Sequence, residues 1–267
     1  MCKPIEVKNE NLYQSQLRVI PLRSQYNKSS YIRILASVVI LYVSISKIIH
    51  DQSSFSTNIR HDPNSIYVPG AGFSGFWFTL GRIQSIEKPF EKNYYCFSAG
   101  CLGVVSRLTN SSVNDMMDYA VSAQQLWKKG EISRYEVASN FIGKLMPIEE
   151  GINSTQLAKK SILDRINIIT TTYGVGMNIR RPKSTEELRE MLIQTTWIPF
   201  ATGFGVAKID QSGIWHMDGG FSFPFHPKCQ NNLNLPLKFD LILNILNPSL
   251  SIQKALEFWR DGISYGF

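Results

Sequence analysis

The chain has 267 residues, a formal net charge of +7, 43% hydrophobic residues and 18% charged residues. This length suits one sizeable α/β domain with a short appendage, and the composition excludes a disordered chain. Residues 1–60 hold eight lysines and arginines but only three acidic residues, so the rest of the chain is close to neutral. The dispersed basic residues favour attraction to a membrane surface and argue against nucleic-acid binding.

The N-terminal segment, residues 1–63, contains an apolar run. Residues 34–46 carry no charge, and a basic residue flanks them on each side. Extended to about residues 31–49, the run approaches the roughly 20 residues that a membrane-spanning helix needs. We interpret it as a signal anchor that holds the protein on a membrane, in the secretory pathway or an organelle. A cleaved signal peptide, or a buried strand and helix of the soluble domain, are the alternatives.

The body of the chain, residues 64–267, alternates segments typical of strands and helices. Strands are expected over residues 66–68, 94–97, 165–172, 175–179, 213–216 and 238–246. Helices are expected over residues 73–86, 99–108, 115–129, 133–145, 154–163, 184–196 and 252–260, with Ser184 and Glu187 as a capping box. Repeated strand–turn–helix units predict an α/β fold with a mainly parallel central sheet and helices on both faces.

Ser98 stands where an apolar, aromatic run stops between small residues. Residues 94–103 read YYCFSAGCLG. A strand, a sharp turn that exposes a serine hydroxyl, and a following helix form a nucleophile elbow, which aims the hydroxyl at a pocket. The sequence therefore favours Ser98 as the nucleophile of a serine hydrolase. An ordinary serine at a helix N-terminus is the alternative.

A glycine-rich loop precedes the first predicted helix. Residues 70–75 read GAGFSG, and glycine allows the backbone to approach a ligand closely. The N–H groups of Gly70, Ala71, Gly72 and Gly75 are therefore candidates for an oxyanion hole. The same donors would suit a phosphate, but no Gly-Lys-Ser/Thr follows, which excludes a P-loop. A tight strand-to-helix turn without chemistry is the alternative.

Asp218 is the candidate base. It follows a predicted strand and precedes Gly219 and Gly220. That places a carboxylate on a flexible turn at a strand end, where the active sites of open α/β sheets gather. A turn-forming Asp-Gly pair is the alternative.

Two histidines suggest a rival scheme. His226 follows Asp218, so the order serine, acid, histidine of an α/β-hydrolase triad is available. His216 alternates with Asp218 along the predicted strand, and we expect it to hydrogen-bond locally.

Four motifs in this order resemble the patatin-like phospholipase family, most closely its triglyceride-lipase branch. The loop reads GAGFSG where the branch has G-x-G-F-x-G, and the elbow reads CFSAG, with Gly100 in place, where it has G-x-S-A-G. Residues 198–203 read IPFATG, similar to I-P-x-x-x-G, and residues 218–222 read DGGFS, similar to D-G-G-x-S. The resemblance covers about residues 64–227.

The resemblance implies a patatin-like three-layer fold and a lipid acyl hydrolase that cleaves the carboxylic esters of phospholipids or acylglycerols. Ser98 would be the nucleophile and Asp218 its base in a dyad, with the oxyanion hole in the glycine loop. The family's ester chemistry generally needs no metal, so no cofactor is expected. The implied partners are a lipid ester substrate and a membrane or lipid-droplet surface.

Two departures from the family pattern fall in the elbow. Cys96 replaces its first glycine, and Phe97 is bulkier than the residue usual before the serine. We expect Cys96 and Cys101 to be buried free thiols, because a disulfide between them would distort the turn. A relative that binds lipid without turnover is therefore the alternative function.

Overall fold

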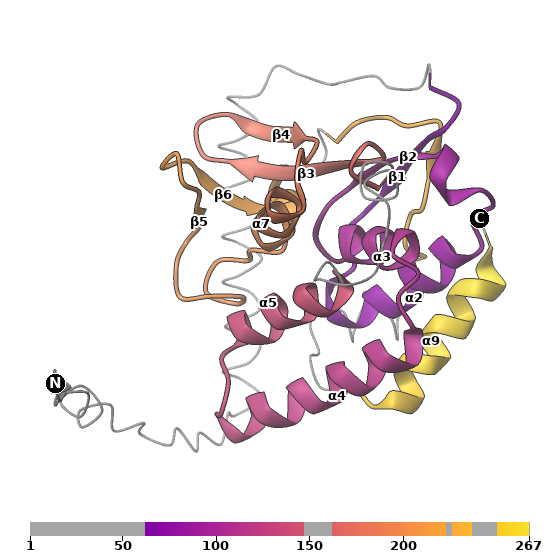
Figure 1. Cartoon of the computed structure of the whole chain (residues 1–267), viewed down its shortest axis with the longest axis horizontal. Coiled ribbons are helices and arrows are strands. Elements are labelled where there is room, and N and C mark those ends of the chain that lie inside the picture. Colours follow the sequence, from indigo (N-terminus) through magenta and orange to yellow (C-terminus); the bar gives the residue numbers. More distant parts are fainter. Residues whose placement is uncertain (1–61, 147–161, 223–225, 237–249, 267) are drawn as a thin grey trace, which may run out of the picture. The chain divides into compact units, whose positions relative to one another are not determined.

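The computed structural model describes residues 62–146, 162–222, 226–236 and 250–266, which belong to one compact unit (Figure 1). Two successive strand–turn–helix units open it. Strand β1 (Ser65–Val68) leads into helix α2 (Gly72–Gln84), and after a short 3-10 turn, η1 (Pro89–Glu91), strand β2 (Asn93–Cys96) leads into helix α3 (Ser98–Leu108). The predicted apolar segment over residues 31–49 and strand over residues 238–246 lie outside the described residues. No helix in the described part of the chain combines the length and apolarity needed to cross a bilayer.

The described strands form one seven-stranded sheet in the order β5-β6-β3-β2-β1-β7, with β4 paired to β3. Its other members are β3 (Ile166–Thr172), β4 (Gly176–Arg180), β5 (Lys208–Ile209), β6 (Trp215–Asp218) and β7 (Asn231–Asn232). Strands β7, β1, β2 and β3 are parallel, whereas β4, β6 and β5 pair antiparallel. The α/β prediction is confirmed, with parallel pairing in the half that carries the elbow.

Strand β3 brings two distant strand ends together. Its residues 166–168 pair with β2, and its residues 170–172 pair with β6 in the opposite direction. Strand β4 occupies the other side of β3, since both Ile168 and Thr170 have a β4 partner as well. Strands β2 and β6 therefore lie on the same side of β3, and their C-terminal ends point toward each other across Ile169.

The two faces of the sheet are covered differently. Ile66, Val68 and other alternate strand residues join the main core, to which all six described helices contribute. Tyr67 and Ile169, which point the opposite way, belong to a smaller cluster with Phe97 and Cys229. Alternation along a strand fixes this division. The six helices of the described residues thus all contribute to the core on one face of the sheet. Among these residues, no helix joins the smaller cluster on the other face.

The remaining described helices are α4 (Val113–Lys129), α5 (Arg134–Leu145), α7 (Thr185–Thr195) and α9 (Ile252–Tyr265) (Figure 1). Ser184 caps α7 as predicted, since its hydroxyl accepts the N–H of Glu187 at 3.1 Å. The Glu187 carboxylate accepts from the N–H of Lys183 rather than from that of Ser184. Helix α9 packs closely on α2, because a Cβ on Gly81 or Gly262 would lie 2.1 Å from a backbone oxygen of the facing helix.

Candidate active site

Ser98 occupies the sharp turn between β2 and α3. Its φ angle is +51°, in the left-handed region that non-glycine residues rarely adopt. Phe97 before it is extended, with φ −143° and ψ 161°. Strained backbone of this kind gathers at functional sites. The predicted strand, turn and helix are therefore present, and the serine itself carries the unusual conformation.

The glycine loop lies directly against Ser98. A Cβ built on Gly70 would come within 2.8 Å of the Cβ of Ser98 and 2.5 Å of the Phe97 ring, so only glycine fits there. Gly100 fits the same interface from the other side, because its Cβ would lie 2.3 Å from the carbonyl oxygen of Pro69. The loop and the elbow are thus in contact, as the sequence suggests.

Helix α2 starts in this loop with N–H groups that its own turns cannot satisfy. Gly72 is its first residue, with φ +60°, and Ala71 is the N-cap residue without a side-chain cap. The first N–H groups of a helix have no intrahelical acceptor, and the helix dipole adds positive potential there. Gly75 lies one turn further on, where its Cβ would meet that of Ala71 at 2.7 Å. The loop N–H groups suit an oxyanion beside Ser98.

Asp218 is the last residue of β6, not a residue of a flexible turn as predicted. A short 3-10 turn, η2 (Gly219–Ser222), follows it. The N–H of Gly220 donates to its Oδ1 at 2.8 Å, and the Thr171 hydroxyl donates to its carbonyl oxygen at 2.9 Å. Since β2 and β6 converge across β3, Asp218 and Ser98 are brought together although 120 positions separate them.

Burial dominates the electrostatics of Asp218. The side chain is 5% exposed. Desolvation raises its pKa from 3.8 to about 6, although hydrogen bonding from Ser98 and from the Gly220 N–H lowers it. Ser98 is close enough to the carboxyl group to lower its pKa, while Oδ2 accepts no complete hydrogen bond from the described residues. Such contacts often tighten only with substrate bound. A carboxyl group that titrates near neutrality and reaches a serine hydroxyl can accept its proton.

We expect Asp218 to make the free energy of unfolding fall as the pH rises from about 4 to about 6. The folded chain keeps the proton up to about pH 6, whereas the unfolded chain releases it near 3.8. The stabilisation that the protonated carboxyl group provides is therefore complete below about pH 4. About 3 kcal/mol of the free energy of unfolding is lost as the pH rises to about 6 and beyond. Urea unfolding between pH 4 and pH 7 measures the change.

Asp218→Asn is the control, because it removes the titrating group. His226 makes the free energy of unfolding rise over the same pH range, since burial lowers its pKa to about 4. The difference between wild type and variant isolates Asp218. An equal pH slope in both proteins would contradict its assignment as a buried, protonatable carboxyl group.

His226 is buried, and both of its ring nitrogens are engaged. Nδ1 accepts a short hydrogen bond from the Tyr67 hydroxyl, and Nε2 donates to the Gly219 carbonyl oxygen at 2.8 Å. A histidine base needs a nitrogen that accepts the serine proton, and here each nitrogen already has another partner. The ring instead supports the DGG turn, so the geometry favours a dyad over the triad.

His216 makes the local contacts that its position predicts. Nε2 lies 3.0 Å from Oδ2 of Asp210, and Nδ1 lies 3.3 Å from the Thr172 hydroxyl. Burial lowers its pKa, and the hydrogen bond with Asp210 opposes that shift. It lies on β6 two residues before Asp218 and is 1% exposed.

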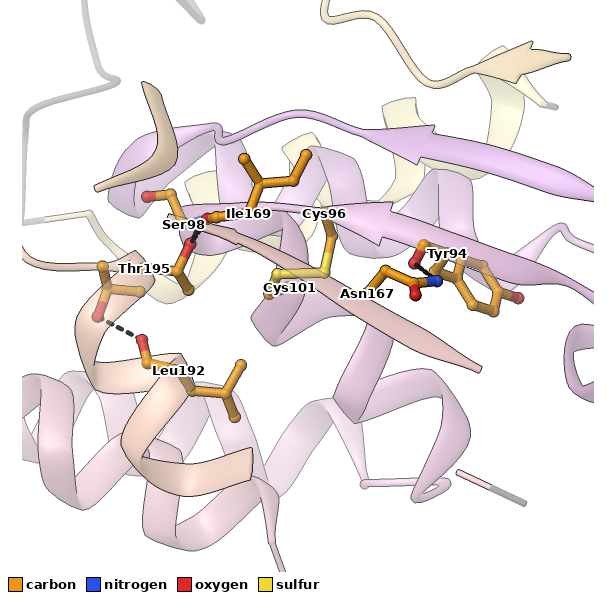
Figure 2. Close-up of a disulfide and its surroundings, with 9 residues drawn as sticks. Tyr94, Cys96, Ser98, Cys101, Asn167, Ile169, Leu192 and Thr195 are labelled. Atoms are coloured by element: carbon orange, nitrogen blue, oxygen red, sulfur yellow. Dashed lines mark hydrogen bonds between the residues drawn. A yellow bond between two sulfur atoms is a disulfide. The ribbon is translucent and has the colours of Figure 1, made fainter. Parts of the chain in front are cut away.

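Cys96 and Cys101 form a disulfide, so the prediction of two free thiols is wrong (Figure 2). The bridge joins the end of β2 to the first turn of α3 and spans Ser98. The expected distortion is absent, because the two Cα atoms are 4.9 Å apart, within the ordinary range for a disulfide, while Ser98 keeps the turn. Both cysteines are fully buried. The bridge ties together the two arms of an elbow that lacks its first glycine.

Phe97 fills the space between the three motifs. A Cβ on Gly219 would lie 2.5 Å from the Cβ of Phe97, and one on Gly220 would lie 3.2 Å from its ring. The ring centroids of Phe97 and His226 are 4.7 Å apart. The bulky residue that departs from the elbow pattern is therefore the surface on which the glycine loop and the DGG turn pack.

Thr195 is the site residue that the sequence analysis missed. Its hydroxyl accepts the N–H of Ser98 at 2.9 Å. The same hydroxyl donates to the carbonyl oxygen of Ile169 at 2.7 Å (Figure 2). A signal was present in the sequence. Leu188, Met191 and Leu192 form the buried stripe of α7, and Thr195 continues it at helical spacing. A buried hydroxyl needs partners.

Comparisons of this chain with protein-family models, with curated proteins and with solved structures give no match.

Proposed function

We propose that the protein is a lipid acyl hydrolase that cleaves carboxylic esters with a Ser98–Asp218 dyad. The observation that supports this most is the convergence of a serine on a strained strand-to-helix turn, a buried carboxyl group and a glycine loop at one point of the sheet. Each component alone is common. Together they supply a nucleophile, a base and N–H donors for a developing oxyanion.

In the proposed reaction, the ionised carboxylate of Asp218 accepts the proton of Ser98 as the hydroxyl oxygen attacks the ester carbonyl carbon. The negative charge that develops on the carbonyl oxygen is held by N–H groups at the start of α2, around Gly70 and Gly72. Collapse of the tetrahedral intermediate releases the alcohol, which takes the proton from Asp218. Water, activated by the same carboxylate, then hydrolyses the acyl-serine. The order of the motifs and their contacts support a patatin-like arrangement of this dyad.

The dyad is tested against the triad by His226→Gln. The amide group can still donate to the carbonyl oxygen of Gly219, so we expect kcat to stay within about tenfold of wild type. Stability should fall by about 1–3 kcal/mol, because the Tyr67 hydroxyl loses its buried acceptor. Ester hydrolysis is measured at a temperature where the variant is folded. A loss of kcat as deep as that of Ser98→Ala would favour the triad.

A lipid surface is the proposed partner, and two hairpin tips are its proposed contact. The hairpin-tip surface consists of Tyr173, Val175, Ile214 and Trp215, which are 75%, 61%, 45% and 47% exposed. They border a shallow, uncharged depression, and the Tyr173 and Trp215 rings are 6.1 Å apart. Tyrosine and tryptophan favour the boundary between acyl chains and water.

The location of the hairpin-tip surface suits a substrate drawn from a bilayer. Thr170 pairs with Asp218, and Tyr173 lies three residues further along the same strand direction. At about 3.3 Å per residue, the tip stands roughly 10 Å beyond the carboxylate. A bilayer in contact with the tips would lie beside the dyad.

The double variant Tyr173→Ser, Val175→Ser should reduce hydrolysis of vesicle-borne phospholipid by at least about fivefold, because apolar area that partitions into the bilayer is lost. Hydrolysis of a soluble short-chain ester should stay unchanged. Phe90→Ser is the matched control, since Phe90 is 46% exposed on η1, which precedes the start of β2 and so lies at the other end of the strands from the Tyr173 tip. Equal losses on vesicles and on the soluble ester would contradict a surface-binding role.

Turnover itself is tested with the full chain on two substrates, a p-nitrophenyl butyrate solution and phosphatidylcholine vesicles. The proposal requires hydrolysis that follows the folded protein through purification. No turnover on either substrate would favour the alternative, a lipid-binding protein that retains the dyad geometry without activity.

A further inference from the structure

The end of α7 and the residues directly after it contact both members of the proposed dyad. Thr195 accepts the N–H of Ser98 at 2.9 Å through its hydroxyl, and the carbonyl oxygen of Trp197 accepts the N–H of Asp218 at 2.8 Å. Thr195 and Trp197, two positions apart, thus accept the backbone N–H groups of Ser98 and Asp218, which are 120 positions apart.

Thr195 also connects Ser98 to the middle of the sheet. Its hydroxyl donates to the carbonyl oxygen of Ile169, the residue of β3 that separates the ends of β2 and β6 (Figure 2). The same oxygen limits Gly219, whose Cβ would lie 2.5 Å from it. Ile169 is therefore a common reference point for the elbow and for the turn after Asp218.

A hydroxyl is suited to this position because it can accept one hydrogen bond and donate another at the same time. The N–H of Ser98 lies at the first turn of α3, where the helix provides no acceptor. Thr195 is fully buried, so water does not replace it. Without this hydroxyl, both the N–H of Ser98 and the carbonyl oxygen of Ile169 would lose a partner.

We propose that Thr195 is a positioning residue that fixes the Ser98 turn relative to β3 and thereby sets the distance between the Ser98 hydroxyl and Asp218. This rests on the proposed dyad. Thr195 does not touch the reacting atoms, and it acts through the backbone of Ser98. The carbonyl oxygen of Trp197, two residues further along the chain, accepts the N–H of Asp218, so a shift of this segment would move both reacting groups.

Three variants test the role. Thr195→Val keeps the shape of the side chain and removes the hydroxyl, whereas Thr195→Ser retains the hydroxyl. Thr196→Val is the matched control. The Thr196 hydroxyl donates to the carbonyl oxygen of Leu192, within its own helix, at 2.9 Å. Each variant is assayed on p-nitrophenyl butyrate for kcat and KM, with thermal unfolding and amide hydrogen exchange at Ser98 measured on the same samples.

Thr195→Val should lower kcat by about 30-fold or more, with KM within about threefold, because small misplacements of a nucleophile cost up to about 100-fold. It should also accelerate exchange at the Ser98 amide by at least about tenfold. Thr195→Ser should keep kcat within about fivefold of wild type. Thr196→Val should match wild type both in kcat and in exchange at the Ser98 amide.

Three results would overturn the proposal or separate it from the dyad. Unchanged kcat in Thr195→Val, with only a lower unfolding temperature, would show a merely structural role and overturn the proposal. Unchanged exchange at the Ser98 amide would overturn it as well, whatever the activity. A wild-type chain without turnover would contradict the proposed function, and the Ser98 amide exchange would then decide whether Thr195 fixes this turn.

Discussion

Ser98→Ala and Asp218→Asn should each lower kcat for ester hydrolysis by at least about 10³-fold. Removing the serine oxygen removes the acyl acceptor, and asparagine cannot take its proton. Both side chains are nearly buried, at 8% and 5% exposed, so no solvent base easily substitutes for Asp218. The residual rate should reflect substrate binding and the oxyanion donors alone.

The double variant tests whether the two residues act as a unit. If the proton passes directly from Ser98 to Asp218, the combined loss should equal the larger single loss instead of the product of the two. A combined loss in kcat equal to the product of the two single losses would contradict a shared step. Asp210→Asn is a useful control, because Asp210 pairs with His216 at 3.0 Å and lies outside the proposed dyad.

Gly100→Ala should destabilise the fold by about 3 kcal/mol and abolish hydrolysis in what remains folded. Its Cβ would lie 2.3 Å from the carbonyl oxygen of Pro69 and 2.7 Å from that of Val68. These are backbone atoms, which cannot rotate away, so α3 and the glycine loop must separate. This separation would move Gly70 and the proposed oxyanion donors of the loop away from Ser98.

Gly143→Ala is the matched control for a helical glycine. A Cβ at Gly143, in α5, meets no atom within 4 Å. The substitution should therefore stabilise the protein by about 0.5–1 kcal/mol, since alanine favours the helix. Urea unfolding and kcat for a soluble ester measure both variants. A Gly100→Ala protein with wild-type stability and activity would contradict the close contact between loop and elbow.

The sequence predicted much of the fold because its signals are local. The short apolar runs of β1 and β2, the helix signal at Ser184 and the two neighbouring strands over residues 165–179 all depend on residues within a few positions. Ser98, Gly70 and Asp218 could be proposed as site residues for the same reason, since each lies where a strand ends.

Other features depend on contacts between distant segments. The approach of β2 and β6 along one side of β3 cannot be deduced from either strand alone. Thr195 continues an ordinary apolar stripe, and only the position of α7 shows that its hydroxyl meets Ser98. The prediction of free thiols is wrong because it rests on the turn alone, whereas the bridge joins the end of a strand to a helix and leaves both in place.

The most direct measurement is reaction of the full chain with a fluorophosphonate probe, followed by mass spectrometry of the peptide that carries it. The dyad predicts one modification, on Ser98, that disappears in Ser98→Ala and slows by at least about 100-fold in Asp218→Asn. Modification at another residue, or equal labelling of wild type and Asp218→Asn, would contradict the proposal that Asp218 activates Ser98.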